Sequence, residues 1–360
     1  MPSRRNFLGA AAGVAFCSCG LLDAAHAQTG ATPRQAVAVG GRRVKTIDVH
    51  AHCVFAEAAA QLGAEAAPPR TTVRGTDETV ITLAQRFAAM DAQRVDMEVL
   101  SVNPYWYNKP RDLAAAIVRI NNEKMAELCA AHPDRFAGFC SLTLQDPALA
   151  VQELETAFRR QGLKGAAIAA NVDGVDFSDP RFSPVWAKAE ELGAVLFIHP
   201  MGTPELNRRF TGNGWLGNTI GNPLDTTIAL SKLIFEGTLD RHPGLKIIAA
   251  HGGGFLPSYA DRSDHACMVN PSGCNAAITL RKRPSEYLNQ IWFDSLVFSP
   301  EAIRHLAAQV GAGQIVLGSD YPFPWQMRPV DHILACDSLT PEQMVGVLGE
   351  NAARLLNIRV

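Results

Sequence analysis

The stretch Thr-Ile-Asp-Val-His-Ala-His at residues 46–52 is the part of the sequence that decides the fold and the site. The apolar residues Ile47 and Val49 predict a buried strand that ends in two histidines. Successive side chains of a strand point to opposite faces, so His50 and His52 share one face. Two imidazoles one residue apart can bind one metal ion from a single strand. The same pattern also fits a strand end with two ordinary polar residues, so the rest of the sequence is needed to distinguish these two interpretations.

Short apolar runs alternate with longer amphipathic segments along the rest of the chain. Runs rich in Val, Ile and Ala without strict polar alternation are typical of parallel strands that are covered on both faces. The eight runs are Lys45–His52, Asp96–Asn103, Phe136–Leu144, Gly165–Asn171, Ala194–His199, Lys246–His251, Ile291–Val297 and Gln314–Asp320. Helical patterns lie between them at Thr82–Gln93, Leu113–His132, Pro147–Gln161, Pro184–Leu192, Thr226–Arg241 and Pro300–Val310. This repetition of strand and helix predicts an α/β fold, a single-domain (β/α)8 TIM-like barrel.

Composition narrows the class of partner. The 360 residues are 47% hydrophobic and 19% charged, which is ordinary for a globular protein. The formal net charge of -2 at pH 7 provides no excess of basic residues that would attract nucleic acid. We therefore expect a small-molecule substrate and no nucleic-acid partner.

The N-terminus has the features of an export leader. The arginine pair Arg4-Arg5 precedes Phe-Leu, a short apolar run follows at Gly9–Leu22, and Ala25-His26-Ala27 offers a cleavage site of small residues. The run is shorter than the about 20 apolar residues that a membrane span needs. The alternative is an apolar helix that stays attached. We predict a twin-arginine signal peptide at 1–27, a lead-in at 28–44, the domain at 45–360, and a periplasmic protein without stable membrane insertion after cleavage.

Two cysteines stand apart from the others. Cys267 and Cys274 bracket a polar Met-Val-Asn-Pro-Ser-Gly segment, so they could close a small disulfide loop in an oxidising compartment. Most of the remaining cysteines of the mature chain lie in apolar runs and are expected to be small core residues.

Polar residues collect at the ends of four predicted strands. The first ends in His50 and His52, the fifth in His199, the sixth in His251 and the eighth in Asp320. Barrel enzymes build their sites at the carboxyl ends of the strands, so these side chains should converge on one rim. Three imidazoles and one carboxylate suit a zinc-like divalent ion, and a fifth residue close by can carry protons. Two insertions, Cys53–Glu78 and Gly202–Leu224, emerge at the same rim.

These motifs resemble the amidohydrolase superfamily (amidohydrolase family 2), and within it the aminocarboxymuconate-semialdehyde decarboxylase group. The resemblance runs from about Lys45 to the C-terminus, and its motifs occur in the family's order. They are His50-Ala-His52, Phe197-Ile-His199-Pro200, Ala250-His251-Gly-Gly-Gly254 and Leu317-Gly-Ser-Asp320-Tyr-Pro-Phe-Pro324.

The resemblance implies a role for each of these residues. It assigns one divalent metal ion, zinc with manganese as the alternative, to His50, His52, His199 and Asp320. It implies that His251 is the catalytic acid or base, acting beside Asp320. It further implies that Arg262 and Arg74 bind carboxylate groups of the substrate. Because the family's equivalent of Arg262 reaches a neighbouring subunit's site, we expect a homodimer.

Some residues qualify this resemblance. The fourth strand ends in Ala169-Ala170-Asn171, and Lys164 lies at its beginning, so no lysine is placed to bridge a second metal ion. Met201 stands where the decarboxylase group has a tryptophan, which leaves the substrate open. Asp294 is interpreted as a residue that supports the ligands by hydrogen bonding.

The leading functional hypothesis is a metal-dependent, non-oxidative decarboxylase of an unsaturated or aromatic carboxylic acid. The alternative within the superfamily is a hydrolase or hydratase of a lactone, a carbon–carbon bond or a double bond, because a barrel does not fix its own chemistry. A second class is a periplasmic metal- or ligand-binding protein. His251 argues against it, since metal storage needs no proton carrier beyond the four ligands.

Overall fold

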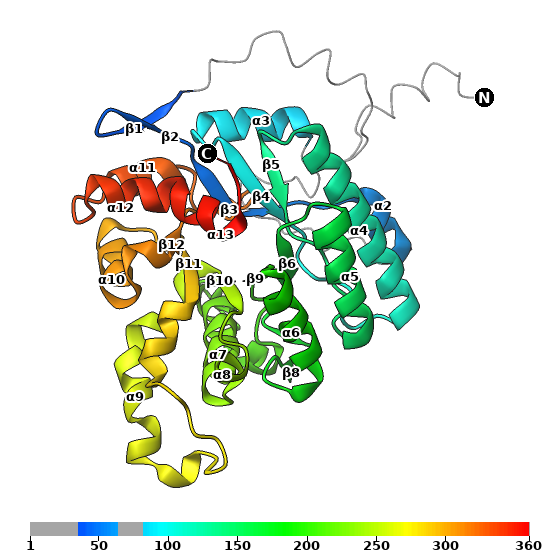
Figure 1. The fold of residues 1–360 in the computed structure, drawn as a ribbon, viewed down its shortest axis with the longest axis vertical. Coiled ribbons are helices and arrows are strands. Elements are labelled where there is room, and N and C mark those ends of the chain that lie inside the picture. The colour runs from blue at the N-terminus through cyan, green and yellow to red at the C-terminus, as the bar shows by residue number, and fades with distance from the viewer. Residues whose placement is uncertain (1–34, 64–81, 360) are drawn as a thin grey trace.

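Parallel strands alternate with helices along the computed structural model, which describes residues 35–63 and 82–359 (Figure 1). The predicted leader and Arg74 lie outside these residues. Each of the eight parallel strands falls within one of the predicted runs, which confirms the α/β class and the order of these strands along the chain. The strands are β3 (Ile47–His52), β4 (Met97–Ser101), β5 (Phe136–Gly138), β6 (Gly165–Ile168), β9 (Val195–Ile198), β10 (Lys246–Ala249), β11 (Ile291–Asp294) and β12 (Ile315–Val316).

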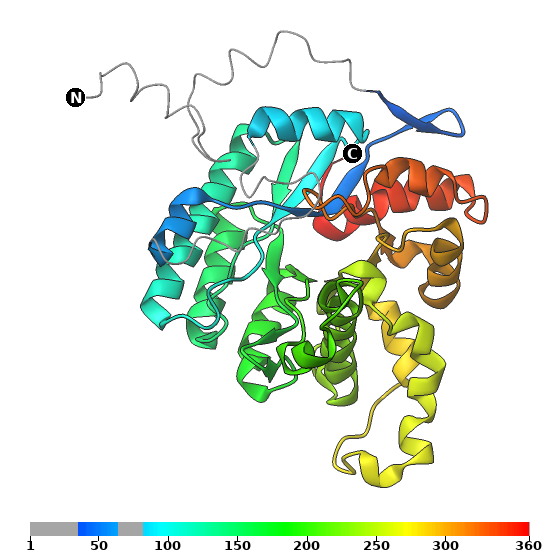
Figure 2. The same cartoon turned by 180° about the vertical axis from the view of Figure 1, so that it is seen from behind.

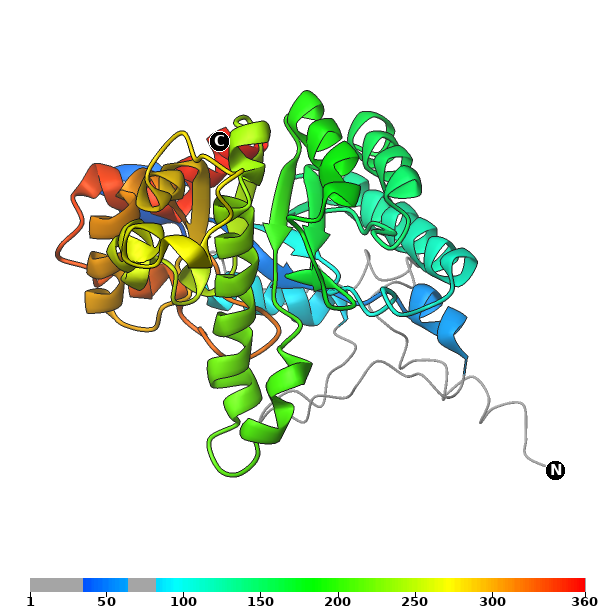
Figure 3. The same cartoon turned by 90° about the horizontal axis from the view of Figure 1, so that it is seen from below.

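Helices follow the strands and lie outside them (Figures 1 and 3). Thr82 begins the first predicted helix through a capping box with Gln85. The single helix predicted over Thr226–Arg241 is wrong, because Gly237 has a φ of 68° and breaks it into α7 and α8. The helices are α2 (Ala56–Ala59), α3 (Leu83–Ala92), α4 (Arg111–Ala131), α5 (Pro147–Arg160), α6 (Ser183–Leu192), α7 (Asn222–Phe235), α8 (Thr238–Arg241), α9 (Ala260–Val269), α10 (Pro300–Val310), α11 (Pro329–Leu334), α12 (Pro341–Val345) and α13 (Asn351–Leu356).

The eight parallel strands form two sheets whose edges are joined at both ends. One sheet has the order β12-β11-β10-β9-β6 and the other the order β3-β4-β5. Between β5 and β6, the Cys140 N–H donates to the Gly165 carbonyl at 2.8 Å and the Ala167 N–H donates to the Cys140 carbonyl at 3.0 Å. Between the end of β12 and β3, the Val49 N–H donates to the Leu317 carbonyl at 2.9 Å. Backbone hydrogen bonds therefore connect the two sheets at both pairs of neighbouring edges.

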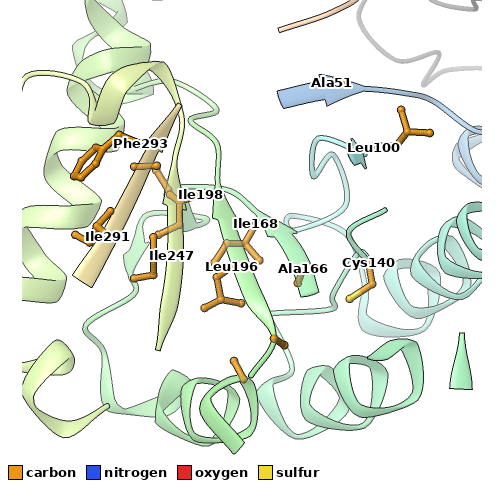
Figure 4. Packing of buried hydrophobic residues seen from close by; sticks show 14 of the residues in the cluster. Ala51, Leu100, Cys140, Ala166, Ile168, Leu196, Ile198, Ile247, Ile291 and Phe293 are labelled. Atoms are coloured by element: carbon orange, nitrogen blue, oxygen red, sulfur yellow. The ribbon is translucent and has the colours of Figure 1, made fainter. Parts of the chain in front are cut away.

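Both faces of the strands are buried, which explains why the sequence lacks polar alternation. In β9, Val195 and Phe197 belong to an inner apolar cluster, whereas Leu196 and Ile198 belong to an outer cluster that packs against helices. Figure 4 shows outer-cluster side chains on successive strands, such as Leu196 and Ile198 on β9 and Ile247 on β10. The core thus has two apolar layers, one on each face of the strands.

Shorter elements complete the described chain. Two antiparallel pairs, β1 (Val37–Val39) with β2 (Arg42–Val44) and β7 (Asn171–Val172) with β8 (Val175–Asp176), lie outside the ring. Helix α9 and the loop after it project from the rest of the fold (Figures 1 and 2). Cys267 and Cys274 form a disulfide in this projection, as predicted. Within residues 35–63 and 82–359, no helix combines the length and the apolar character needed to cross a membrane.

A buried ion pair supports the first strand. Arg86 on α3 donates to the Glu98 carboxylate of β4 at 2.5 Å, and both side chains are 1% exposed. The same guanidinium donates to the His52 carbonyl and lies over the Tyr321 ring at 4.8 Å. Arg86 therefore connects helix α3 to the strand end that carries the two histidines.

Replacement of Arg86 by methionine tests this pair. Because the Glu98 carboxylate would be left buried and unpaired, the free energy of unfolding should fall by about 3–5 kcal/mol. Urea denaturation measures the change. The exposed pair Arg159–Glu155 provides the control, since Arg159→Met should cost no more than about 1 kcal/mol. Equal losses in the two variants would contradict a special role for the buried pair.

Candidate metal centre

A β-bulge in β3 directs His50 and His52 toward the side of the inner apolar cluster. The register with β4 shifts between Asp48 and Ala51, so β3 carries one residue more than its partner over this stretch. Val49 belongs to the inner apolar cluster and Ala51 to the outer one. The His50 ring accordingly lies 5.0 Å from the ring of inner-layer Phe197, measured between centroids. The two histidines share a face as predicted, and the bulge decides which face.

The predicted donors from distant parts of the chain meet at one point. His199 directly follows β9, and Asp320 lies four residues beyond β12 with a φ of 65°. The four residues are His50, His52, His199 and Asp320, and all are buried. Each offers one nitrogen or oxygen atom, and these four atoms lie within 4.8 Å of one another. The structure thus brings together the four residues to which the sequence assigned the metal ion.

His251 lies beside this group. Its φ of 56° turns the chain immediately after β10, and its Nε2 lies 3.6 Å from Oδ2 of Asp320. Its ring centroid is 5.1 Å from that of His199. The His251 side chain is 15% exposed, whereas that of His50 is fully buried. His251 is therefore placed to exchange protons between the group of donors and the solvent.

Hydrogen bonds outside the group orient two of the histidines. Nδ1 of His50 donates to Oδ2 of Asp294 at 2.6 Å, and Nδ1 of His52 contacts the Ser101 hydroxyl at 2.9 Å. The Nε2 atoms of both rings therefore face inward, 3.1 Å apart. Partners of this kind fix the tautomer and the ring orientation of metal-binding histidines. The sequence indicated Asp294, but a serine at the end of β4 gave no signal for Ser101.

The Asp294 carboxylate also holds the chain that follows β10. Its Oδ2 accepts the His251 N–H at 2.9 Å and its Oδ1 accepts the Gly252 N–H at 2.8 Å. Burial raises the pKa of the Asp294 carboxyl, but hydrogen bonding and charge from His50 and His251 outweigh burial and lower it. Asp294 thus supports a predicted ligand and the predicted proton carrier at the same time.

The donors fit a divalent cation. Both ring nitrogens of His199 are buried, and neither has a hydrogen-bond partner within the described residues. Burial lowers the pKa of His199 well below its usual range, and the nearby His52 and His50 lower it further. Its imidazole is therefore neutral at pH 7, which is the form that binds metals. Three imidazoles and one carboxylate match the ligands that zinc takes in proteins.

The pKa of His50 is shifted upward, whereas that of His199 is shifted downward. Burial by itself lowers the pKa of His50, but the Asp320 and Asp294 carboxylates more than compensate and raise it to about 10. A cation that binds to Nε2 of His50 must therefore displace a proton.

Arg262, the remaining predicted site residue that the structure describes, does not lie with this group of donors. Arg262 is exposed on α9, where it lines a cavity of about 600 Å³ together with Tyr259, His265 and Cys274. Arg74 lies outside the described residues. Lys164 precedes β6, at the end of the strand opposite to the donors.

Aromatic side chains line the rim above the donors. The Phe323 ring lies 6.0 Å from that of His52. Trp325, two residues further on, stacks on Trp215 from the insertion after β9 with centroids 5.5 Å apart and rings inclined by 13°. Phe298, four residues after Asp294, lies 5.9 Å from Trp325. The pairing of Trp215 with Trp325 could not be inferred from their separation in the sequence.

Known proteins are similar to this chain in sequence and in fold. The model of the Amidohydrolase family matches residues 47–358. The 2-amino-3-carboxymuconate-6-semialdehyde decarboxylase of Dictyostelium discoideum is 34% identical over 278 residues, which cover 76% of each chain. The crystal structure of 5-carboxyvanillate decarboxylase from Sphingomonas paucimobilis has a TM-score of 0.79 and 26% identity, and the match covers 88% of this chain and all of that one.

A further solved structure contains a metal ion. The 5-carboxyvanillate decarboxylase of Novosphingobium aromaticivorans, with bound manganese and 3-methoxy-4-hydroxy-5-nitrobenzoic acid, matches with a TM-score of 0.71 and 25% identity. The match covers 76% of this chain and 80% of that one. Together with the donor set, this similarity supports a divalent metal ion in the present chain.

Replacement of His199 by alanine tests the centre. Loss of one of four ligands should weaken the binding of Mn²⁺ or Zn²⁺ by at least about tenfold, because even partners outside the ligand sphere contribute 10- to 100-fold. Equilibrium dialysis followed by metal analysis measures the affinity. The partly buried His305 on α10 supplies the control, and His305→Ala should bind the ion as the wild type does. Unchanged affinity in the His199 variant would remove this residue from the site.

Proposed function

The chain belongs to the amidohydrolase family, and we propose that it is a metal-dependent, non-oxidative decarboxylase of an aromatic or unsaturated carboxylic acid. The observation that carries the proposal is a fifth side chain, His251, whose Nε2 lies 3.6 Å from the Asp320 carboxylate of the four-donor group. The relatives support decarboxylation over the hydrolase or hydratase alternative, since those described above are decarboxylases.

The residues of this chain have separate tasks in the reaction. His50, His52, His199 and Asp320 would hold a divalent ion, which supplies positive charge that binds and polarises substrate oxygen atoms. His251 donates a proton from Nε2 to the carbon that bears the carboxylate. The bond between that carbon and the carboxylate then breaks, its electron pair returns to the π system, and carbon dioxide leaves. Solvent reprotonates His251 through its 15% exposed side chain.

We propose zinc as the resident ion, with manganese as the alternative. Three imidazoles with one carboxylate support zinc. The manganese in the similar decarboxylase supports the alternative.

The aromatic rim supports an aromatic or conjugated substrate. Trp215 is 48% exposed and Phe298 is 55% exposed, and both pack on Trp325, two residues after Phe323, whose ring lies 6.0 Å from that of His52. A planar substrate could pack against such surfaces.

We further infer that the eight strands act as one closed (β/α)8 barrel. The hydrogen bonds from β5 to β6 and from the end of β12 to β3 support this inference, as does the similarity to the solved decarboxylases. In such a barrel the donors lie at the carboxyl ends of the strands, where barrel enzymes place their sites.

We propose that the chain forms a homodimer through α9. This projecting helix, which also carries Arg262, exposes Met268 and Val269, at 67% and 78%. Burial of these apolar side chains against a second copy would favour association. Light scattering should give a dimer for the wild type and a monomer for Met268→Glu/Val269→Glu; a monomeric wild type would contradict the proposal.

We also propose that residues 1–27 direct export by the twin-arginine route to the periplasm. The disulfide between Cys267 and Cys274 supports an oxidising compartment. Replacement of both Arg4 and Arg5 by lysine should retain the protein in the cytoplasm, as measured by fractionation; undiminished export of this variant would contradict the assignment.

Carbon dioxide release tests the reaction. The Mn²⁺- or Zn²⁺-loaded protein should decarboxylate at least one member of a panel of dihydroxybenzoates, carboxyvanillates and unsaturated dicarboxylic acids. A chelator should abolish the release, and added metal should restore it. His251→Ala should keep the metal and lose turnover by about 10²- to 10⁴-fold, the usual contribution of a proton-transferring residue.

The controls separate the possible failures. His305→Ala should decarboxylate as the wild type does, because His305 lies away from the donors and bonds Ser258. Metal-loaded protein that hydrolyses lactones or esters but releases no carbon dioxide would favour the hydrolase alternative. Unchanged turnover in His251→Ala would refute the role of His251.

A further inference from the structure

We propose that Asp225 is a positioning residue for His199, acting through the backbone that follows β9. This inference rests on the proposed metal centre, but it does not depend on which reaction the centre catalyses. Asp225 lies in the first turn of α7, is 4% exposed, and belongs to none of the motifs described above.

The three histidines of the donor group are held in different ways. The outer ring nitrogens of His50 and His52 are fixed by Asp294 and Ser101. His199 has no such partner within the described residues, since both of its ring nitrogens are unbonded. Its ring therefore depends for its position on packing and on the backbone of residue 199.

The sheet holds that backbone only as far as the peptide bond between Ile198 and His199, whose carbonyl accepts the Ala250 N–H at 3.1 Å. The His199 N–H donates to the Ile168 carbonyl at 2.9 Å, as the last contact of β9 with β6. Pro200 comes next and has no N–H to donate. The following two N–H groups lie beyond the end of the strand, where the parallel ladder offers them no acceptor.

Asp225 supplies the missing acceptor. Its Oδ2 accepts the Met201 N–H at 3.0 Å and the Gly202 N–H at 3.2 Å. Its Oδ1 accepts from the Asn171 amide at 3.2 Å, which links the segment after β6 to the segment after β9. The buried Asp225 carboxylate therefore connects Met201 and Gly202, two and three residues after His199, to α7 and to the segment that follows β6.

A carboxylate is suited to this position. One oxygen must accept two N–H groups while the other accepts a third donor, and an ionised carboxylate can do this because it carries only acceptors. An amide of the same shape would turn either its oxygen or its NH₂ group toward Met201 and Gly202, so it cannot reproduce all three bonds.

Asp225→Asn in the full chain tests the proposal. Displacement of the backbone at residue 199 should weaken Co²⁺ or Mn²⁺ binding by about tenfold, at the lower end of the effect of residues that orient metal ligands. Equilibrium dialysis measures the affinity, and the visible absorption of the Co²⁺-loaded protein reports the ligand geometry directly. We expect this spectrum to change in Asp225→Asn, and turnover to recover in part at high metal concentration.

Asp240→Asn is the matched control. Asp240 on α8 also accepts a backbone N–H, from Arg281 at 3.0 Å, and a side-chain donor, the Tyr287 hydroxyl at 2.6 Å. It contacts no donor of the metal centre, so its variant should keep the wild-type affinity and spectrum even where thermal stability falls.

The outcomes distinguish this proposal from the function it rests on. Wild-type protein that binds neither Co²⁺ nor Mn²⁺ would overturn the metal centre itself. A wild type that binds the ion, with an Asp225→Asn variant of equal affinity and identical spectrum, would overturn the role of Asp225 alone. A variant that changes the spectrum while Asp240→Asn does not would support it.

Discussion

The backbone contact between β3 and the segment that follows β12 is the interaction on which the centre depends. The Asp320 N–H donates to the His50 carbonyl at 2.8 Å, and the His52 N–H donates to the Tyr321 carbonyl at 2.6 Å. Asp48 strengthens this contact, because its carboxylate accepts the N–H groups of both His50 and Ser319. These bonds place a carboxylate from near the end of the chain beside two imidazoles from near its beginning. Oδ1 of Asp320 lies 3.1 Å from Nε2 of His50 and 3.0 Å from Nε2 of His52.

Burial gives this arrangement its chemical character. Charged and polar side chains in an apolar interior are costly unless they are paired, and the inner layer around the donors is apolar. Several polar side chains here have a hydrogen-bond partner, such as His50 with Asp294, but the two ring nitrogens of His199 have none within the described residues. A cation would give the His199 imidazole a partner and would offset the negative charge of Asp320. His251, being partly exposed, remains available for proton transfer.

Sequence patterns predicted the strands well because both faces of each strand are buried and the apolar runs are therefore continuous. They predicted the donors because four strand ends carry His or Asp, and parallel strands in a ring bring their carboxyl ends to one rim. They failed at the helix over Thr226–Arg241, where Gly237 adopts a left-handed conformation. A glycine permits this conformation but does not require it, so the break could not be predicted from the sequence. They also gave no indication of Ser101 or Asp225, because serine and aspartate are common at strand ends and in first turns of helices and acquire a role only from what they contact.

The sequence by itself determined the parallel α/β class, the order of the strands and the identity of the four candidate ligands, since these follow from local periodicity and from residue type. Only the tertiary structure decided the direction in which those ligands point. The bulge after Asp48 turns His50 and His52 inward, and the left-handed backbone of His251 and Asp320 aims both side chains at the same point. Neither feature has a local sequence signature, because each is imposed by hydrogen bonds to strands that are distant in the chain.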